Sequence, residues 1–449
     1  MHRLIFYALL VPYVVLFLPG QLKAQDPPTF TLEEAIAQAL QENIEIKNAK
    51  LEIVDADYLI VERRAWGLPQ ISANVNFQQY FQVPKQPLPE PFVLLIQSLN
   101  PGQEVNREAS FFLRNNFSPT ITAETVLFDG TYFVGLQAAR AYKKYALQEF
   151  ETKVKQVKES VTDAFLPVVL LQENILLLEK NIESLQKIVL ETQVLFENGF
   201  VEKLDVDRQL LSLANLEVER DNLNHQFEGA LNGLKLAIGL PQPTPLGIES
   251  DLEDLILPEF DQWKSENSKV EVRPEFQLAQ TGIELNEMNV KNFKAGYLPS
   301  IRLFGSYSQN YQGDNFNDGF WAPTGVFGFR INIPIFDGLD KKAKIGRARV
   351  DLEQAQNQLH QLKNLVNVEV ENAKEVLTGA QKRYENQLSN LALAKRIYET
   401  TLIKYKEGVG SSLEIIQAEQ SLYTTQRNYL NALFDYVKAG LDLKYALGK

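Results

Sequence analysis

The sequence has no cysteine and few of the other residues that bind metals or perform catalysis. In 449 residues it contains no Cys, two Met and three His. Without cysteine the chain can form no disulfide bond and no thiolate metal site, and it offers no thiol for a lipid anchor. His225 and His360 lie apart in helical stretches, where a surface or packed histidine is the simplest interpretation. We therefore predict no catalytic residue, no metal and no cofactor.

An excess of positive charge is also missing. The chain has 45 Lys and Arg against 57 Asp and Glu, which gives a formal net charge of −12. Proteins that bind nucleic acids present a basic surface that neutralises phosphates. The acidic balance therefore predicts no nucleic-acid partner.

Long apolar runs are absent beyond the N-terminus. Residues 1–24 combine Arg3, an apolar stretch at 4–18 and the small residue Ala24, which is the pattern of a secretory signal peptide. The alternative is a membrane anchor helix, but a run of about 15 residues broken by Pro12 is short for a span. We predict cleavage near Ala24 and no transmembrane helix in the mature chain.

What the sequence does contain is a duplication. Three short motifs return in the same order: WGLP at 66–69 as GYLP at 296–299, LFDG at 127–130 as IFDG at 335–338, and FENG at 196–199 as YKEG at 405–408. A repeat of this kind indicates one structural unit used twice. The mature chain divides into a first repeat at 25–240, a proline-rich linker at 241–273 and a second repeat at 274–449.

Each repeat contains two runs in which apolar and polar residues alternate. We place the resulting hairpins at about 70–128 and 300–336, and we expect an irregular exposed loop outside the cell at 83–109. A tilted strand of about ten residues can cross a membrane with lipid on one face and water on the other. Four strands cannot close a barrel, whereas two copies would give eight strands and three would give twelve. Alternation alone favours an ordinary β-sandwich, but each pair of runs interrupts long helices, which favours the membrane.

Long helices are predicted on both sides of these hairpins. Apolar residues recur at alternating spacings of three and four from Leu147 to Phe196 and from Val366 to Tyr405. Sustained heptads specify coiled-coil packing. One helix over residues 130–197 would be roughly 100 Å long. A coiled-coil scaffold explains these helices but not the strands, and a β-barrel pore explains the strands but not the helices.

Three segments are similar to the TolC-type outer-membrane factor family: RPEF at 273–276, YLPSI at 297–301 and YKEGVGSSLEIIQAE at 405–419. The resemblance covers nearly the whole mature chain. It implies a mainly α fold with a membrane β-barrel, in which a homotrimer builds a twelve-stranded β-barrel in the outer membrane of a Gram-negative bacterium and a helical α-barrel through the periplasm.

The resemblance also implies a function. It indicates a passive exit duct of a tripartite efflux pump or a type I secretion system, surrounded by outer-membrane lipid. Its partners would be a periplasmic adaptor (membrane fusion) protein and an inner-membrane pump, which would supply the energy. The alternative is a periplasmic coiled-coil scaffold without a pore.

The glycine turns that join long to short helices are expected at the periplasmic tip. Glycine permits the positive φ of such a reversal. The resemblance assigns the adaptor contact to Gly199 and Phe200 in one repeat and to Gly408 and Val409 in the other. The alternative is that both glycines are only helix caps.

Two carboxylates, Asp205 and Glu414, lie six residues after these glycines and are candidates for a periplasmic gate. Three copies would set each of them as a ring of charge at a narrow opening, which selects or blocks cations. The alternative role is to stabilise a helix N-terminus through its dipole. By resemblance, Tyr405 joins the closing network, Gln417 replaces a second acid of the family's ring, and the network's arginine falls on Gly410.

Overall fold

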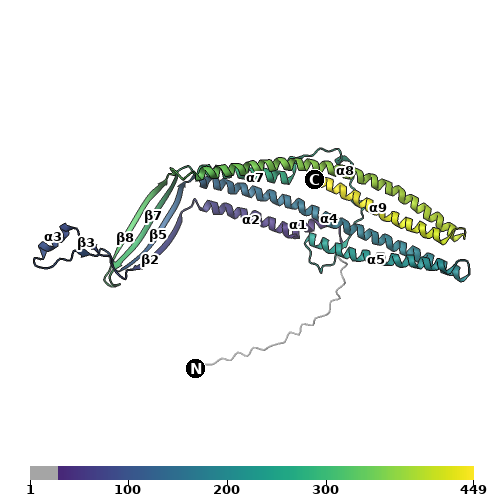
Figure 1. Ribbon diagram of the computed structural model, residues 1–449, viewed down its shortest axis with the longest axis horizontal. Helices are drawn as coiled ribbons and strands as arrows, with labels where there is room; N and C mark the ends of the chain where they lie inside the picture. The colour runs from purple at the N-terminus through teal and green to yellow at the C-terminus, as the bar shows by residue number, and fades with distance from the viewer. Residues whose placement is uncertain (1–28) are drawn as a thin grey trace, which may run out of the picture.

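The computed structural model describes residues 29–449, and the chain is elongated, with a β-sheet towards one end and long helices over the rest (Figure 1). The predicted signal peptide at 1–24 lies outside the described residues. An outer loop projects from the sheet at the end away from the helices, and two helical hairpins end together at the opposite tip.

The sheet is a four-stranded antiparallel meander. Its strands, in spatial order, are β2 (Gln70–Gln79), β5 (Asn115–Phe128), β7 (Ser300–Gly313) and β8 (Phe320–Asn332). The central pair, β5 and β7, joins the two repeats. Among the described residues, the outer edges of β2 and β8 have no strand partner.

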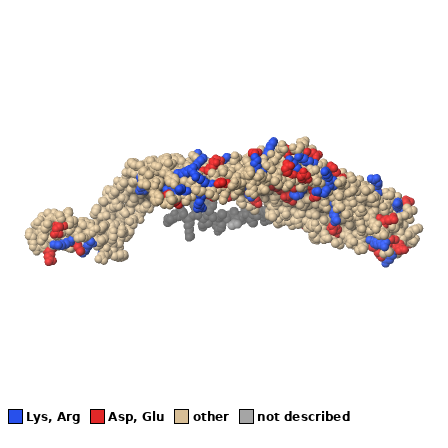
Figure 2. Space-filling view, turned by 45° about the horizontal axis from the view of Figure 1, so that its top comes forward, with Lys and Arg blue, Asp and Glu red and all other residues tan. Residues whose placement is uncertain are grey.

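The two faces of the sheet differ in polarity because the register keeps the alternating residues of all four strands aligned. One row across the sheet pairs Ile71 with Ala123, Ala123 with Gly305 and Gly305 with Phe327. The next row pairs Ser72 with Thr122, and so belongs to the opposite, polar face. On the side shown in Figure 2, the sheet is largely free of charged side chains between the outer loop and the helices.

The strand boundaries correct one sequence-based expectation. The second hairpin was expected to reach to about 336, but its last strand, β8, begins at Phe320 and ends at Asn332. Pro323 and Gly325 hide the earlier alternation, although both lie at apolar-face positions of the ladder opposite Gln309 and Tyr307.

The helices continue the order of the strands. The main helices are α1 (Leu32–Glu42), α2 (Ile44–Ala65), α4 (Gly130–Glu197), α5 (Lys203–Ile238), α7 (Pro274–Ala295), α8 (Asp340–Lys406) and α9 (Ser412–Ala446). Next to the sheet, α2 packs on α4, α4 on α7 and α7 on α8, so α2 and α8 are edge helices as β2 and β8 are edge strands. Further away, α5 returns along α4 and α9 returns along α8.

The main core lies at the waist, where the linker crosses the helices. Short elements occur here: β1 (Thr29–Phe30), which pairs with β6 (Gly247–Ile248), the 3₁₀ turns η1 (Glu253–Leu255) and η2 (Val270–Val272), and α6 (Phe260–Trp263). Phe165, Leu234 and Leu443 are fully buried in this core. By length and composition α4 is the one described helix that could cross a membrane, and 39% of its apolar window is buried.

The outer loop is more ordered than the sequence indicated. Residues 83–109 were expected to be irregular, yet they form β3 (Gln86–Pro87), α3 (Glu90–Leu99) and β4 (Glu108–Ala109). The expectation failed because proline was counted as a helix breaker. Pro91 lies in the first turn of α3, where the missing N–H has no intrahelical partner to lose.

Candidate functional site

Both helical tips reverse on a glycine in the left-handed conformation. Gly199 has φ 74° and Gly408 has φ 73°. A Cβ atom at either position would meet nothing within 4 Å, so the backbone angle, not space, requires glycine. The N–H of Phe200 donates to the carbonyl of Leu195, and this bond closes the first turn.

The residue after each glycine is an apolar side chain presented to solvent. Phe200 is 77% exposed and Val409 is 78% exposed. The turns that carry them, between α4 and α5 and between α8 and α9, lie at the end of the molecule furthest from the sheet (Figure 1). The structure therefore places the four predicted contact residues at two neighbouring tips, each with one exposed apolar side chain.

The predicted gate residue Asp205 joins the two helical hairpins. One of its carboxylate oxygens accepts a hydrogen bond from the N–H of Glu202 at 3.2 Å, within the capping box of α5. The other accepts a hydrogen bond from the hydroxyl of Ser412, the first residue of α9. Asp205 therefore lies in the first turn of α5, where the alternative role would place it, and in addition accepts a hydrogen bond from the second hairpin. Sequence reasoning missed Ser412, because its partner lies 207 positions away.

The predicted gate residue Tyr405 also connects the hairpins. Its side chain is buried, and its hydroxyl lies 3.0 Å from the hydroxyl of the fully buried Thr192 on α4. Beside it, the Lys406 ammonium lies 3.0 Å from a carboxylate oxygen of Glu191. Thr192 could have been noticed in the sequence, because it is a polar residue at a seam position of the α4 heptads.

Glu414 and Gln417 lie outside this cluster, on exposed parts of α9. The N–H of Glu414 donates to the hydroxyl of Ser411, so Glu414 lies in the first turn of the helix, where a negative charge is favoured. Among the described residues, Glu414 makes no ion pair. Of the four gate candidates, the structure therefore brings Asp205 and Tyr405 into contacts between the hairpins and leaves Glu414 and Gln417 free of them.

A buried carboxyl that sequence reasoning did not single out lies further along α9. Glu419 is 1% exposed, and the hydroxyl of Tyr423 donates to it at 2.5 Å. Burial raises the pKa of the Glu419 carboxyl from 4.5 to about 7, although the hydrogen bond from Tyr423 opposes the shift. The buried Gln209 of α5 has no hydrogen-bond partner for its amide within the described chain.

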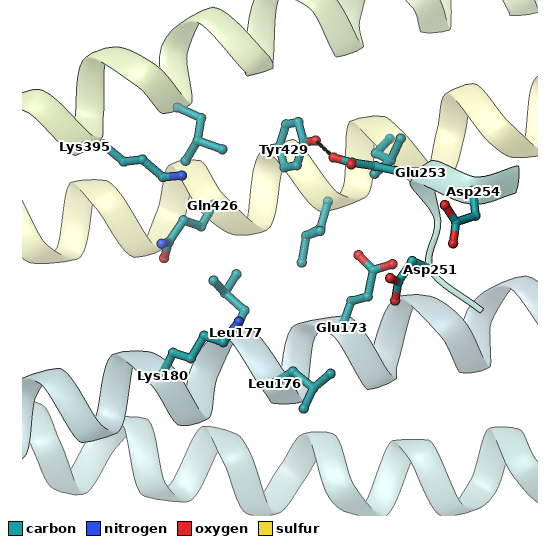
Figure 3. A pocket seen from close by; sticks show the side chains of 13 residues that line it. Glu173, Leu176, Leu177, Lys180, Asp251, Glu253, Asp254, Lys395, Gln426 and Tyr429 are labelled. Atoms are coloured by element: carbon teal, nitrogen blue, oxygen red, sulfur yellow. Dashed lines mark hydrogen bonds between the residues drawn. The ribbon is translucent and has the colours of Figure 1, made fainter. Parts of the chain in front are cut away.

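The waist contains a groove of about 380 Å³ between α4, α8, α9 and the linker (Figure 3). Its acids hold the linker in place. The N–H of Leu252 donates to Glu173 at 2.5 Å, and the hydroxyl of Tyr429 donates to Glu253 at 2.6 Å. No cluster of side chains able to hold a metal ion occurs among residues 29–449. The groove is thus explained by the packing of the linker.

Comparison with known proteins identifies the class. Residues 35–240 and 268–449 match the family described as "Outer membrane efflux protein". The alkaline protease secretion protein AprF of Pseudomonas aeruginosa is 21% identical over 349 residues, which are 74% of this chain and 70% of AprF. The proteases secretion protein PrtF of Dickeya chrysanthemi is 20% identical over 74% of this chain and 73% of its own length.

Solved structures show the same fold. The CmeC outer membrane channel of Campylobacter jejuni superposes with a TM-score of 0.73 at 18% identity, over 93% of this chain and 85% of CmeC. The chain therefore belongs to the outer membrane efflux protein family, whose fold is that of channels and not of enzymes. It is an outer-membrane exit duct for efflux or type I secretion.

Proposed function

We propose that three copies of this chain close one continuous tube, with a twelve-stranded β-barrel in the outer membrane and an α-barrel below it. The observation that supports this proposal is the matched order β2-β5-β7-β8 and α2-α4-α7-α8, in which the outer edges of β2 and β8 have no strand partner among the described residues. Unpaired backbone groups are not tolerated in lipid. The two edges run antiparallel, so β8 of one copy can pair with β2 of the next and continue the meander.

In this assembly each repeat supplies one hairpin and one pair of long helices to the wall. The repeats are 25–240 and 274–449, and the linker at 241–273 crosses the waist. The apolar face of the sheet meets lipid and the polar face lines the lumen. Cleavage of the signal peptide at 1–24 precedes assembly.

The duct is passive, and its tips are closed at rest. The contacts of Asp205 with Ser412 and of Tyr405 with Thr192 hold the two hairpins of a chain together, and Glu414 and Gln417 add exposed polar groups to the opening. A periplasmic adaptor binds at Gly199, Phe200, Gly408 and Val409 and spreads the hairpins, and an inner-membrane pump supplies the energy. The names of AprF and PrtF describe secretion of proteases, which supports secretion through such a duct.

Engineered cysteines test the closure, because the natural chain has none. Asn74→Cys on β2 is combined in turn with Thr324→Cys, Val326→Cys and Gly328→Cys on β8, all on the polar face. A disulfide needs Cβ atoms about 4 Å apart, so the cysteine pair that matches the true register should cross-link efficiently and the other two pairs should cross-link less. Non-reducing gels of outer-membrane fractions should show a ladder that ends at three copies.

The controls separate the alternatives. Asn74→Cys with Ser306→Cys uses the interior strand β7 and should form no bond between copies. A ladder that stops at two copies would indicate an eight-stranded barrel. A soluble protein without cross-links would favour the coiled-coil scaffold and contradict the duct.

A further inference from the structure

All charged side chains of the four-stranded sheet lie in one place. Within the described strands β2, β5, β7 and β8 there are three charged residues: Glu124, Arg302 and Arg330. Arg302 is the third residue of β7 and Arg330 is the third from the end of β8, so the cluster lies at the end of the sheet nearest the helices. All three charges of the four strands thus lie within three consecutive rungs of the ladder.

The register places these charges side by side. Arg302 lies directly opposite Arg330, and two rungs further along the same face Glu124 lies opposite Phe304. The Arg302 guanidinium lies 3.4 Å from a carboxylate oxygen of Glu124, and both side chains are partly exposed. The Arg330 guanidinium lies 5.3 Å from the centre of the Phe304 ring. Among the described residues Arg330 has no carboxylate partner.

This arrangement has an unbalanced positive charge. Like charges directly opposite on two strands are destabilising, and a single carboxylate offsets one of the two guanidinium groups. The ring of Phe304 stabilises Arg330 by a cation–π contact, which leaves its N–H groups free to bind an acceptor. The cluster carries net positive charge in a chain whose overall charge is −12.

The side chains belong to the polar face. Arg302 and Arg330 alternate with Leu303 and Phe329, which lie on the apolar face. On the proposed function, on which this step rests, the polar face lines the lumen. Three copies then bring six guanidinium groups and three carboxylates to one level, where the barrel opens into the helical tube.

We propose that Arg302 and Arg330 form a basic ring inside the barrel that selects solutes bearing carboxylate or phosphate groups. The planar fork of arginine binds both of these groups through paired hydrogen bonds. A ring of charges of one sign in a low-dielectric wall raises the local concentration of ions of the opposite sign. The ring is thus a specificity determinant of the duct, and the carboxylate of Glu124 neutralises part of its positive charge.

The first test is ion selectivity of the full-length protein in planar bilayers under a tenfold KCl gradient. The double variant Arg302→Gln/Arg330→Gln should lower the chloride-to-potassium permeability ratio about threefold or more. Glu124→Gln should raise the ratio. Arg107→Gln, which removes the same charge in the outer loop beyond the strands, should leave it unchanged.

The second test does not depend on an open tip. Inorganic triphosphate added to the protein in micelles should raise the melting temperature of the assembly, and the double variant should lose this shift. If the double variant conducts with the wild-type permeability ratio, or if triphosphate raises the melting temperature of both proteins equally, the basic ring is refuted and the proposed duct is not. If no protein conducts and none cross-links between β2 and β8, the proposed function itself fails.

Discussion

The two helical tips share one backbone and differ in the side chains around it. Gly199 and Gly408 reverse the chain with φ angles within a degree of each other. At the offset of 209 that relates the two tip motifs (196–199 and 405–408), however, Phe196 corresponds to Tyr405, and the half-exposed Leu210 corresponds to the buried Glu419. The two tips share the turn, while the second has polar groups that bond to α4 or are buried where the first has apolar ones.

The difference indicates a division of roles. The first tip contributes Asp205 and Thr192, which meet Ser412 and Tyr405 of the second tip. Neither hairpin contains both halves of a contact. The closed state of one chain is therefore a property of the pair of repeats, and changes at one tip should be felt at the other.

The largest effect, on export, is expected at the feature that the tips share, the exposed apolar side chain after each glycine. Phe200→Asp and Val409→Asp each place a charge on an exposed apolar contact, and each should reduce export about tenfold or more, since a desolvated contact loses at least about 1.4 kcal/mol of binding. Export through the native adaptor and pump is measured and normalised to protein in the outer membrane. Val218→Asp, which places the same charge on another exposed apolar side chain, on the shaft of α5, serves as control. Full export by both tip variants would exclude the adaptor contact.

The second-largest effect is expected at the gate candidates, where substitutions at the two tips should change the conductance to different extents. Replacing Asp205 and Glu414 together by Asn and Gln should raise single-channel conductance in bilayers. Asp205→Asn should produce most of the increase because it weakens the bond to Ser412, whereas Glu414→Gln removes an exposed charge alone. Unchanged conductance in the double variant would rule out a gate at these residues.

A pH effect should separate the second tip from the first. The pKa of Glu419 is raised when folded, so its contribution to stability is fully present below about pH 4.5 and is lost as the pH rises through about 7. The melting temperature should therefore be higher at pH 5.5 than at pH 8. Glu419 should contribute at most about 3 kcal/mol of this difference to the free energy of unfolding. Glu419→Gln should remove most of this difference, and Leu210→Gln in the first repeat should not. Equal pH dependence in wild type and Glu419→Gln would refute the assignment.

The smallest effect concerns the backbone that the tips share. Gly199→Ala and Gly408→Ala should each destabilise by about 1 kcal/mol, because a Cβ is disfavoured at positive φ even where space is free. Gly233→Ala, in the interior of α5, should instead stabilise by about 0.5–1 kcal/mol. The measurement is the melting temperature of the assembly. Unequal losses at the two glycines would show that the reversals are not equivalent.

The long elements could be predicted because their periodicity is local. The heptads indicated a helix over 130–197, and the structure has α4 at Gly130–Glu197. Predictions failed where one residue type was read too simply, as with the prolines of α3 and β8.

The site could be predicted in its positions and not in its bonds. The glycines, Asp205 and Tyr405 were identified from motifs, and their roles remain predictions. Their partners, Ser412 and Thr192, lie 207 and 213 positions away, so no local pattern could join them. These contacts depend on how α4, α5, α8 and α9 pack together, and the sequence of a single helix does not show that packing. Glu419 was missed for the same reason, because its burial depends on neighbouring helices.

The unbroken course of α4 also has a mechanical meaning. Its 68 residues make a rod about 100 Å long between the root of the barrel and the tip. In a rod of this length a small tilt at one end produces a large displacement at the other: a tilt of about 3° at the root moves the tip by about 5 Å. The membrane end can therefore stay almost still while the far end swings wide, and a partner that pushes at the tip works with the full leverage of the helix.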